Sequence, residues 1–199
     1  MGQKLPSSST FTKYPLSCDF GGRKVLNLGC GFTKYAARNV VNLDAYDNCK
    51  PDVVHDLSKM PLPFEDETFD LILANHILEH VPGWWECFDD CCRILKPGGR
   101  IEVWVPGPGN DSILGYRDHV NTINVCSWYG VKNVGRNPAN AWAAANSGGH
   151  ARKVFLENHT YHMENFWWLK ILPEAMQKWC AIYLRNVVFE VGFFLAKGI

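Results

Sequence analysis

Residues 24–31, which read KVLNLGCG, restrict the fold of this chain strongly. The apolar first half suits a central strand of a parallel sheet, where both faces are buried. Gly29 and Gly31 allow a sharp turn and let the backbone approach a ligand to a distance that a Cβ atom would prevent. Residues 41–44 then form a second strand that ends in Asp44, whose carboxylate can accept hydrogen bonds from two ribose hydroxyls. The pattern predicts nucleoside binding at the carboxyl edge of an open α/β sheet, with a tight turn that binds nothing as the simpler alternative.

The glycine spacing narrows the class of nucleoside. The third glycine of the dinucleotide fingerprint is replaced by Lys34, and the connection to residues 41–44 has room for little more than one helical turn, at residues 34–38. A pyrophosphate site needs a helix N-terminus directed at the anion. The short connection therefore disfavours NAD or FAD and favours a cofactor without phosphates.

Strand and helix patterns alternate through the rest of the first half. Further strands are predicted at residues 52–56, 69–74 and 101–105. An amphipathic helix is predicted at residues 83–95, followed by a glycine turn at residues 96–99. Asp56 ends the third strand and Leu57 follows it, so the carboxylate can accept from an adenine amine and the leucine can pack on the ring. This alternation predicts a parallel sheet with right-handed crossovers.

Five motifs occur in order over residues 23–106: LNLGCG, VNLD, HDLSKMPLPFEDETFDLI, ANHILEHV and RILKPGGRIEVWVP. Together they resemble the class I S-adenosylmethionine-dependent methyltransferases, and most closely the methyltransferase type 11 group. The resemblance implies an α/β, Rossmann-like open sheet of about seven strands, mostly parallel with an antiparallel C-terminal edge and helices on both faces. One departure is Asn27, where many relatives carry an acid that helps to hold the ammonium group of the cofactor.

The resemblance also assigns cofactor-binding residues by position. Residues 29–31 would line the methionine part, Asp44 would hold the ribose, Asp56 and Leu57 the adenine, and Asn75 would lie under the transferred methyl. The full set expected to contact S-adenosylmethionine comprises Leu28, Gly29, Cys30, Gly31, Asp44, Ala45, Asp56, Leu57, Asn75, His76 and His80.

Residues 76–80, His-Ile-Leu-Glu-His, also fit the inverted zinc-peptidase pattern H-x-x-E-H. That chemistry needs both imidazoles on one face of a continuous helix, with the glutamate as base. Here a predicted strand runs into the pattern from Ala74, and Pro82 prevents a helix from continuing beyond it. We therefore expect no metal site.

Composition points to one domain and to no nucleic-acid partner. The chain has 199 residues, with 20 Lys plus Arg against 20 Asp plus Glu, and no basic run. Residues 1–22 form an expected N-terminal arm without a signal-peptide core, which predicts a cytoplasmic protein. Residues 23–199 form the domain, divided into a cofactor-binding core (23–106), an insert that covers the acceptor (107–163), and a covering helix with the last strands (164–199).

The insert is expected to supply the acceptor site, because long irregular connections are uncommon unless they are functional. Its acceptor-site candidates are Asp118, His119, Trp128, Tyr129 and His150, with His159 and His162 further on. His119 is the preferred catalytic base, since imidazole titrates near neutral pH. The simpler alternative for each is a surface loop residue.

Residues 164–184 are rich in tryptophan and interrupted by charges, so they are predicted to cover the sheet rather than to span a membrane. The segment could instead face a homodimer partner or a lipid surface. Residues 187–191 and 192–196 are expected to form the last strand or a hairpin.

The family resemblance implies methyl transfer from S-adenosylmethionine, and we expect the acceptor to be the oxygen or nitrogen of a small molecule or glycan. Two alternatives remain open. One is a catalytically silent protein that binds S-adenosylmethionine and regulates or assembles with others. The other is a different nucleotide-binding α/β enzyme, including one that uses NAD.

Overall fold

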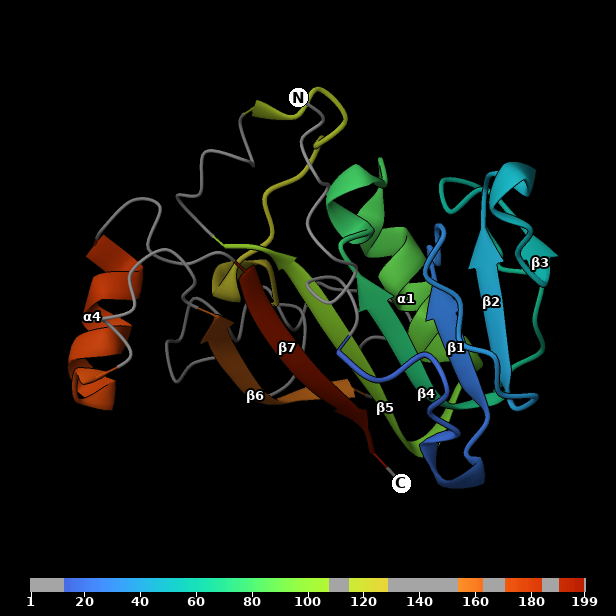
Figure 1. Ribbon diagram of the computed structural model, residues 1–199, viewed down its shortest axis with the longest axis horizontal. Coiled ribbons are helices and arrows are strands. Elements are labelled where there is room, and N and C mark those ends of the chain that lie inside the picture. The colour runs from blue at the N-terminus through green and yellow to red at the C-terminus, as the bar shows by residue number, and fades with distance from the viewer. Residues whose placement is uncertain (1–12, 108–114, 129–153, 163–170, 184–189, 199) are drawn as a thin grey trace, which may run out of the picture.

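Seven strands form one sheet in the order β3-β2-β1-β4-β5-β7-β6 (Figure 1). The computed structural model describes residues 13–107, 115–128, 154–162, 171–183 and 190–198. The strands are β1 (Val25–Leu28), β2 (Val40–Asp44), β3 (Val53–Val54), β4 (Phe69–Asn75), β5 (Leu95–Pro106), β6 (Val154–His162) and β7 (Glu190–Lys197). The first five pair in parallel, whereas β7 is antiparallel to both of its neighbours. The predicted mixed sheet is confirmed.

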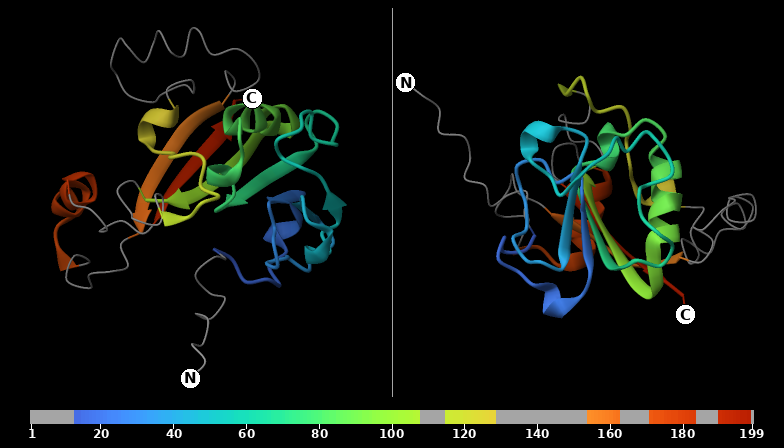
Figure 2. Two further views of the ribbon diagram at one scale, coloured as in Figure 1. Left: turned by 90° about the horizontal axis from the view of Figure 1, so that it is seen from above. Right: turned by 90° about the vertical axis from the view of Figure 1, so that its right-hand side faces the viewer.

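Helix α1 (Trp84–Ile94) covers one face of the sheet (Figure 2). The helix buries Cys87, Phe88, Cys91, Cys92 and Ile94, which recur at the spacing of one helical face. These side chains join the main core with the apolar residues of β1, β4 and β5. The amphipathic helix predicted at residues 83–95 is therefore confirmed.

The second face is covered by the segment before β1 and by the β1–β2 connection. Tyr14, Cys18 and Phe20 of this segment, with η1 (Phe20–Gly22), pack in a second apolar cluster around Val25 and Leu71. In the described residues, η1 and irregular chain take the place of the predicted helical layer on this face.

The helical turn predicted at residues 34–38 is wrong. The side-chain amide of Asn42 accepts a hydrogen bond from the backbone nitrogen of Tyr35 at 3.0 Å and donates to its carbonyl oxygen at 3.0 Å. Both backbone groups of Tyr35 are thus used outside a helical ladder, which is how asparagine competes with helix formation.

The C-terminal edge differs from the prediction. Strand β6 lies at Val154–His162, within the segment expected to be an irregular insert, and pairs along its length with β7. For residues 187–196, predicted to form the last strand or a hairpin, the described residues show one strand, because β7 runs without a turn from Glu190 to Lys197.

Helix α4 (Glu174–Tyr183) lies beyond the β6 edge rather than across a face of the sheet (Figures 1 and 2). Met176 and Trp179 are exposed, while Cys180 is buried against the core. The described part of the predicted covering segment thus contacts the core through Cys180 at this edge, and residues 163–170 and 184–189 lie outside the described part. Among the helices that are described, none combines the length and apolarity needed to cross a bilayer.

Candidate functional site

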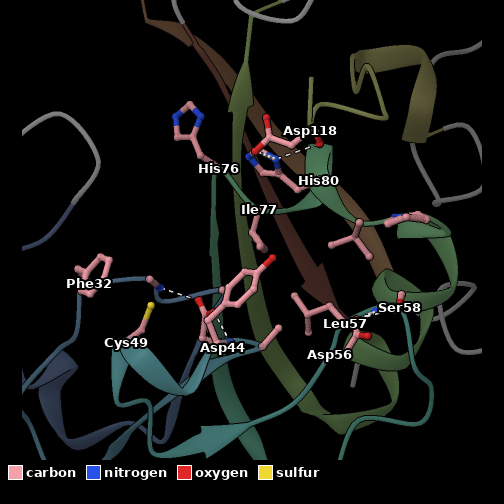
Figure 3. A pocket seen from close by; sticks show the side chains of 16 residues that line it. Phe32, Asp44, Cys49, Asp56, Leu57, Ser58, His76, Ile77, His80 and Asp118 are labelled. Atoms are coloured by element: carbon pink, nitrogen blue, oxygen red, sulfur yellow. Dashed lines mark hydrogen bonds and ion pairs between the residues drawn. The ribbon is translucent and has the colours of Figure 1, made fainter. Parts of the chain in front are cut away.

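A cavity of about 450 Å³ opens at the carboxyl ends of β1, β2 and β4. The strand order reverses between β1 and β4, and open α/β sheets bind ligands at such a point. Eight residues predicted to contact the cofactor line it, namely Gly29, Gly31, Asp44, Ala45, Asp56, Leu57, His76 and His80 (Figure 3). The structure thus brings most of the predicted site residues together from four separate segments.

The two glycines of the turn are required for different reasons. Gly29 has a φ of +65°, and a Cβ atom there would lie 2.2 Å from Cγ1 of Ile77. Gly31 has a φ of +50°, but a Cβ atom there would meet nothing within 4 Å. Gly29 therefore allows Ile77 to pack closely against the turn in the cavity wall, and Gly31 leaves space open beside it.

Asp44 ends β2 and is 8% exposed. Its Oδ2 accepts a hydrogen bond from the backbone nitrogen of Gly31 at 2.7 Å, and its Oδ1 accepts from that of Tyr46 at 3.0 Å. A carboxylate has about four acceptor positions. Asp44 can therefore hold the two surrounding loops and still accept hydrogen bonds from a ligand.

Three predicted cofactor residues do not line the cavity. Leu28 and Cys30 are buried in the core below it. Asn75 ends β4, and its buried Oδ1 accepts no hydrogen bond from the described residues. An unsatisfied buried amide oxygen at this strand end is consistent with a ligand that donates to it.

Asn27 serves the local structure. It is 3% exposed, and its Nδ2 donates to the carbonyl oxygen of Thr33 at 3.0 Å and to Oδ1 of Asn42 at 3.1 Å. The amide therefore braces the β1–β2 connection where many relatives carry an acid.

Asp56 and Leu57 lie at the other end of the cavity. Oδ1 of Asp56 accepts from the backbone nitrogen of Ser58 at 3.0 Å and from its hydroxyl at 2.8 Å. These bonds lower the pKa of Asp56, which favours the ionised form that accepts from an amine. Two exposed aromatic side chains that also line the cavity, Phe32 and Tyr46, are absent from the set predicted from the sequence. Only their positions in the sequence could have indicated them, because Phe32 is one residue after Gly31 and Tyr46 is two residues after Asp44.

His76 is held by two acids. Its Nε2 lies 2.8 Å from Oε2 of Glu190, and its Nδ1 lies 3.3 Å from Oε1 of Glu79. Burial lowers the pKa of His76, but the contacts with Glu190 and Glu79 outweigh burial and raise it to about 9. Glu190 is fully buried and also forms an ion pair with Lys13.

The inverted zinc-peptidase arrangement does not form. Residues 78–80 are a single 3-10 turn, η3 (Leu78–His80), and His76 precedes it with a φ of +48°. The imidazole of His76 points away from Asp44 toward its partner Glu190 (Figure 3). His76 and His80 therefore do not project from one helical face.

The segment around His119 reaches the rim of the cavity. Nδ1 of His80 lies 3.1 Å from the carbonyl oxygen of Asp118 and 3.3 Å from its Oδ2, and both residues line the cavity. The ring of His119 lies edge to face with that of His80, with centroids 4.6 Å apart. Burial and the neighbouring His80 lower the pKa of His119. His119 itself is not part of the cavity lining.

Trp128 and His159 do not line the cavity. The prediction for Trp128 is wrong, because its ring is fully buried against Trp84, Phe88 and Phe193. His159 lies on β6, with its ring stacked on Phe193. Tyr129, His150 and the side chain of His162 lie outside the described residues.

Comparison with known proteins gives consistent matches. Residues 26–103 match the family model of the type 11 methyltransferase domain. An uncharacterized methyltransferase of Mycobacterium tuberculosis is 29% identical over 143 residues, which cover 62% of this chain and 54% of that protein. A sterol 4-C-methyltransferase of Caenorhabditis elegans is 35% identical over 135 residues, covering 62% of this chain and 40% of that protein. The chain spans about half the length of the curated relatives it matches.

A crystal structure of an S-adenosylmethionine-dependent methyltransferase from Archaeoglobus fulgidus shares the fold. The TM-score is 0.55 at 14% identity, over 88% of this chain and 86% of that one. These matches agree with the order of the strands and with the glycine turn beside the acid at the end of β2. Residues 26–103 therefore form a methyltransferase domain of type 11, in a sheet that shares the fold of an S-adenosylmethionine-dependent methyltransferase.

Proposed function

We propose that this protein transfers the methyl group of S-adenosylmethionine to the oxygen or nitrogen of a small-molecule or glycan acceptor. The observation that carries the proposal is the cavity at the β1–β4 reversal, where Gly31, Asp44 and Asp56 converge. The two carboxylates suit a nucleoside. Asp44 retains free hydrogen-bond acceptor positions for ribose hydroxyls, and ionised Asp56 can accept a hydrogen bond from the adenine amine.

The proposed cofactor fits the turn as well. No Cβ atom projects from Gly31 into the space beside it, so the backbone can lie against a ligand there. The buried Oδ1 of Asn75 offers an acceptor near the end of β4. Leu28 and Cys30 would support the turn from below rather than touch the ligand.

S-adenosylmethionine supplies an electrophilic methyl group, so the protein mainly has to align donor and acceptor and exclude water. Alignment of this kind can supply about 7–11 kcal/mol of the barrier. For a hydroxyl acceptor, S-adenosylmethionine would supply the methyl carbon and keep the C–S electron pair, and a base of the protein would take the hydroxyl proton. His119 is the proposed base, and its buried Nδ1 has no hydrogen-bond partner among the described residues.

A silent protein that binds S-adenosylmethionine is the second candidate. The observation that favours it is the position of His119, which lies behind His80 and Asp118 and not in the cavity lining. An acceptor would have to enter beside Asp118 to reach it.

The cellular location and the macromolecular partners of the protein are also proposals. We expect no nucleic-acid partner and a cytoplasmic location. Met176 and Trp179 of α4 are about half exposed, which supports a homodimer contact or a peripheral membrane contact through the tryptophan-rich segment.

Calorimetric titration with S-adenosylmethionine, S-adenosylhomocysteine and NAD tests the proposal. The expected result is binding of the first two and not of NAD. Ligand at a hundred times its dissociation constant should stabilise the protein by about 2.7 kcal/mol, which raises the melting temperature. Binding without transfer of labelled methyl to any of a panel of small-molecule and glycan acceptors would favour the silent candidate. The absence of a melting shift in folded protein would refute both.

A further inference from the structure

We propose that Glu79, His80 and His119 form a binding site for a divalent transition-metal ion such as Zn²⁺, on the wall of the cofactor cavity. One ligand atom of each residue lies within 4.8 Å of those of the other two. Glu79 and His80 come from η3, whereas His119 comes from a segment about forty residues later, so the trio exists only in the folded chain. His80 also lines the cavity, which places the trio at its edge.

Glu79 is the strongest indication of a bound cation. It is 2% exposed, and neither carboxylate oxygen has a hydrogen-bond partner among the described residues. The imidazole of His76 lies 3.3 Å from Oε1 and pairs with it, so Oε2 is the oxygen left without a partner among the described residues. Buried carboxylates are normally hydrogen-bonded, paired or bound to metal. Coordination of an ion would satisfy Oε2.

The backbone of Glu79 also holds the segment that carries His119, the third proposed ligand. Its carbonyl oxygen accepts hydrogen bonds from the backbone nitrogens of Val120 at 2.9 Å and Asn121 at 3.1 Å. The side chain of Asn121 donates in turn to the carbonyl oxygens of Leu78 and Val81. These bonds dock the chain after His119 onto η3 and fix the imidazole beside Glu79.

The imidazoles of His80 and His119 each have a ring nitrogen that can coordinate a metal ion. Nδ1 of His80 contacts Asp118, through the carbonyl oxygen at 3.1 Å and Oδ2 at 3.3 Å, which leaves the other ring nitrogen to coordinate. A carboxylate or carbonyl behind a metal-ligating histidine is the common second layer of such sites. Nδ1 of His119 is buried and has no described hydrogen-bond partner.

Two imidazoles and one carboxylate suit Zn²⁺ bound with an open fourth position, and they also suit Fe²⁺. The sequence pattern H-x-x-E-H suggested His76 and His80 as the zinc ligands, but Glu190 holds His76, and His119 takes its place. Metal binding by the trio does not depend on methyl transfer. It would exclude the proposed role of His119 as a base, because a coordinated imidazole is no longer available to take a proton.

Metal uptake by the untagged full chain tests the site. The protein is stripped with chelator, dialysed and titrated with Co²⁺, whose visible absorption reports coordination, and then with Zn²⁺ in competition. We expect about one ion per chain, and a loss of affinity of about 10–100-fold or more in His119→Ala and Asp118→Asn. His55→Ala is the matched control, because His55 contacts the carbonyl oxygen of Lys59 and lies outside the trio.

Three results would overturn the site. They are no uptake by the folded wild type, uptake that His119→Ala leaves unchanged, and uptake that His55→Ala removes. Binding of S-adenosylhomocysteine is measured on the same metal-free samples. This measurement tests the proposed function separately from the metal site, because the cofactor cavity can be intact whether or not metal binds.

Discussion

Oδ2 of Asp44 lies 2.7 Å from the backbone nitrogen of Gly31, so a hydrogen bond joins the acid at the end of β2 to the glycine turn after β1. The other oxygen of the same carboxylate accepts from the backbone nitrogen of Tyr46 at 3.0 Å. The residue proposed to bind ribose therefore also sets the shape of both loops around it. Substitutions at Asp44 have to separate these two roles.

Asp44→Asn should weaken S-adenosylhomocysteine binding while the protein stays folded. Asparagine keeps one acceptor oxygen, but its amide group cannot accept from the second backbone nitrogen or from ribose. The expected loss is about 1.5–3 kcal/mol, roughly tenfold to hundredfold in affinity by calorimetry. Asp47→Asn, an exposed acid of η2 (Asp47–Cys49), is the control and should bind normally. Equal affinity in Asp44→Asn and wild type would mean that the ribose lies elsewhere.

Gly29→Ala should destabilise the ligand-free protein more than Gly31→Ala. Both positions have positive φ, which costs an alanine about 1–2 kcal/mol. At Gly29 the new Cβ would also overlap the side chain of Ile77, and overpacking of this kind costs typically about 1–3 kcal/mol. Urea unfolding measures both changes. Ile77→Ala should recover part of the loss in Gly29→Ala and none in Gly31→Ala, and equal losses at the two glycines would contradict the packing explanation.

Local patterns predicted the half of the sheet that builds the cavity at the ends of β1, β2 and β4. Residues 24–31 show the strand and turn directly, because burial on both faces demands an apolar run and positive φ demands glycine. The same local logic failed at residues 34–38, where Asn42 binds the backbone of Tyr35 from the next strand. It also failed at β6, whose residues pair with a strand tens of positions later in the chain.

Long-range contacts explain the unpredicted parts of the site. His76 binds Glu190, 114 positions away, and no periodicity connects the two residues. His119 reaches Glu79 and His80 because backbone hydrogen bonds dock its segment on η3. Trp128 resembled an acceptor residue in sequence, but tertiary packing places it in the core. Composition shows which side chains are available and does not show which of them meet.

Glu190→Gln should strongly destabilise the protein. Glu190 is fully buried and pairs with both Lys13 and His76, so the substitution leaves Lys13 without its carboxylate and His76 with Glu79 alone. Breaking a buried ion pair costs about 3–5 kcal/mol, measurable by urea unfolding at neutral pH. Glu157→Gln is the matched control, because its pair with Arg100 is partly exposed and such pairs contribute about 0–1 kcal/mol. A loss in Glu190→Gln no larger than in the control would show that the network contributes little to stability.

Glu102→Gln should stabilise the protein at neutral pH. Burial raises the pKa of Glu102 above its ordinary value of 4.5, although the hydrogen bonds from the hydroxyl of Tyr14, 2.8 Å from each carboxyl oxygen, act in the opposite direction. The folded state therefore binds this proton more tightly than the unfolded state. That stabilisation is fully present below the unfolded pKa and is lost as pH rises through the folded pKa.

At neutral pH the buried carboxylate is thus ionised at a cost that a neutral amide avoids, and glutamine keeps an oxygen that accepts from Tyr14. Melting temperatures of Glu102→Gln and wild type should differ most at neutral pH, in favour of the variant, and converge as pH falls below 4.5. Glu65→Gln, at an exposed position, should show no such trend. If Glu102→Gln is instead less stable at neutral pH, then attraction to Arg23 and Arg100, which lowers the pKa of Glu102, outweighs its burial.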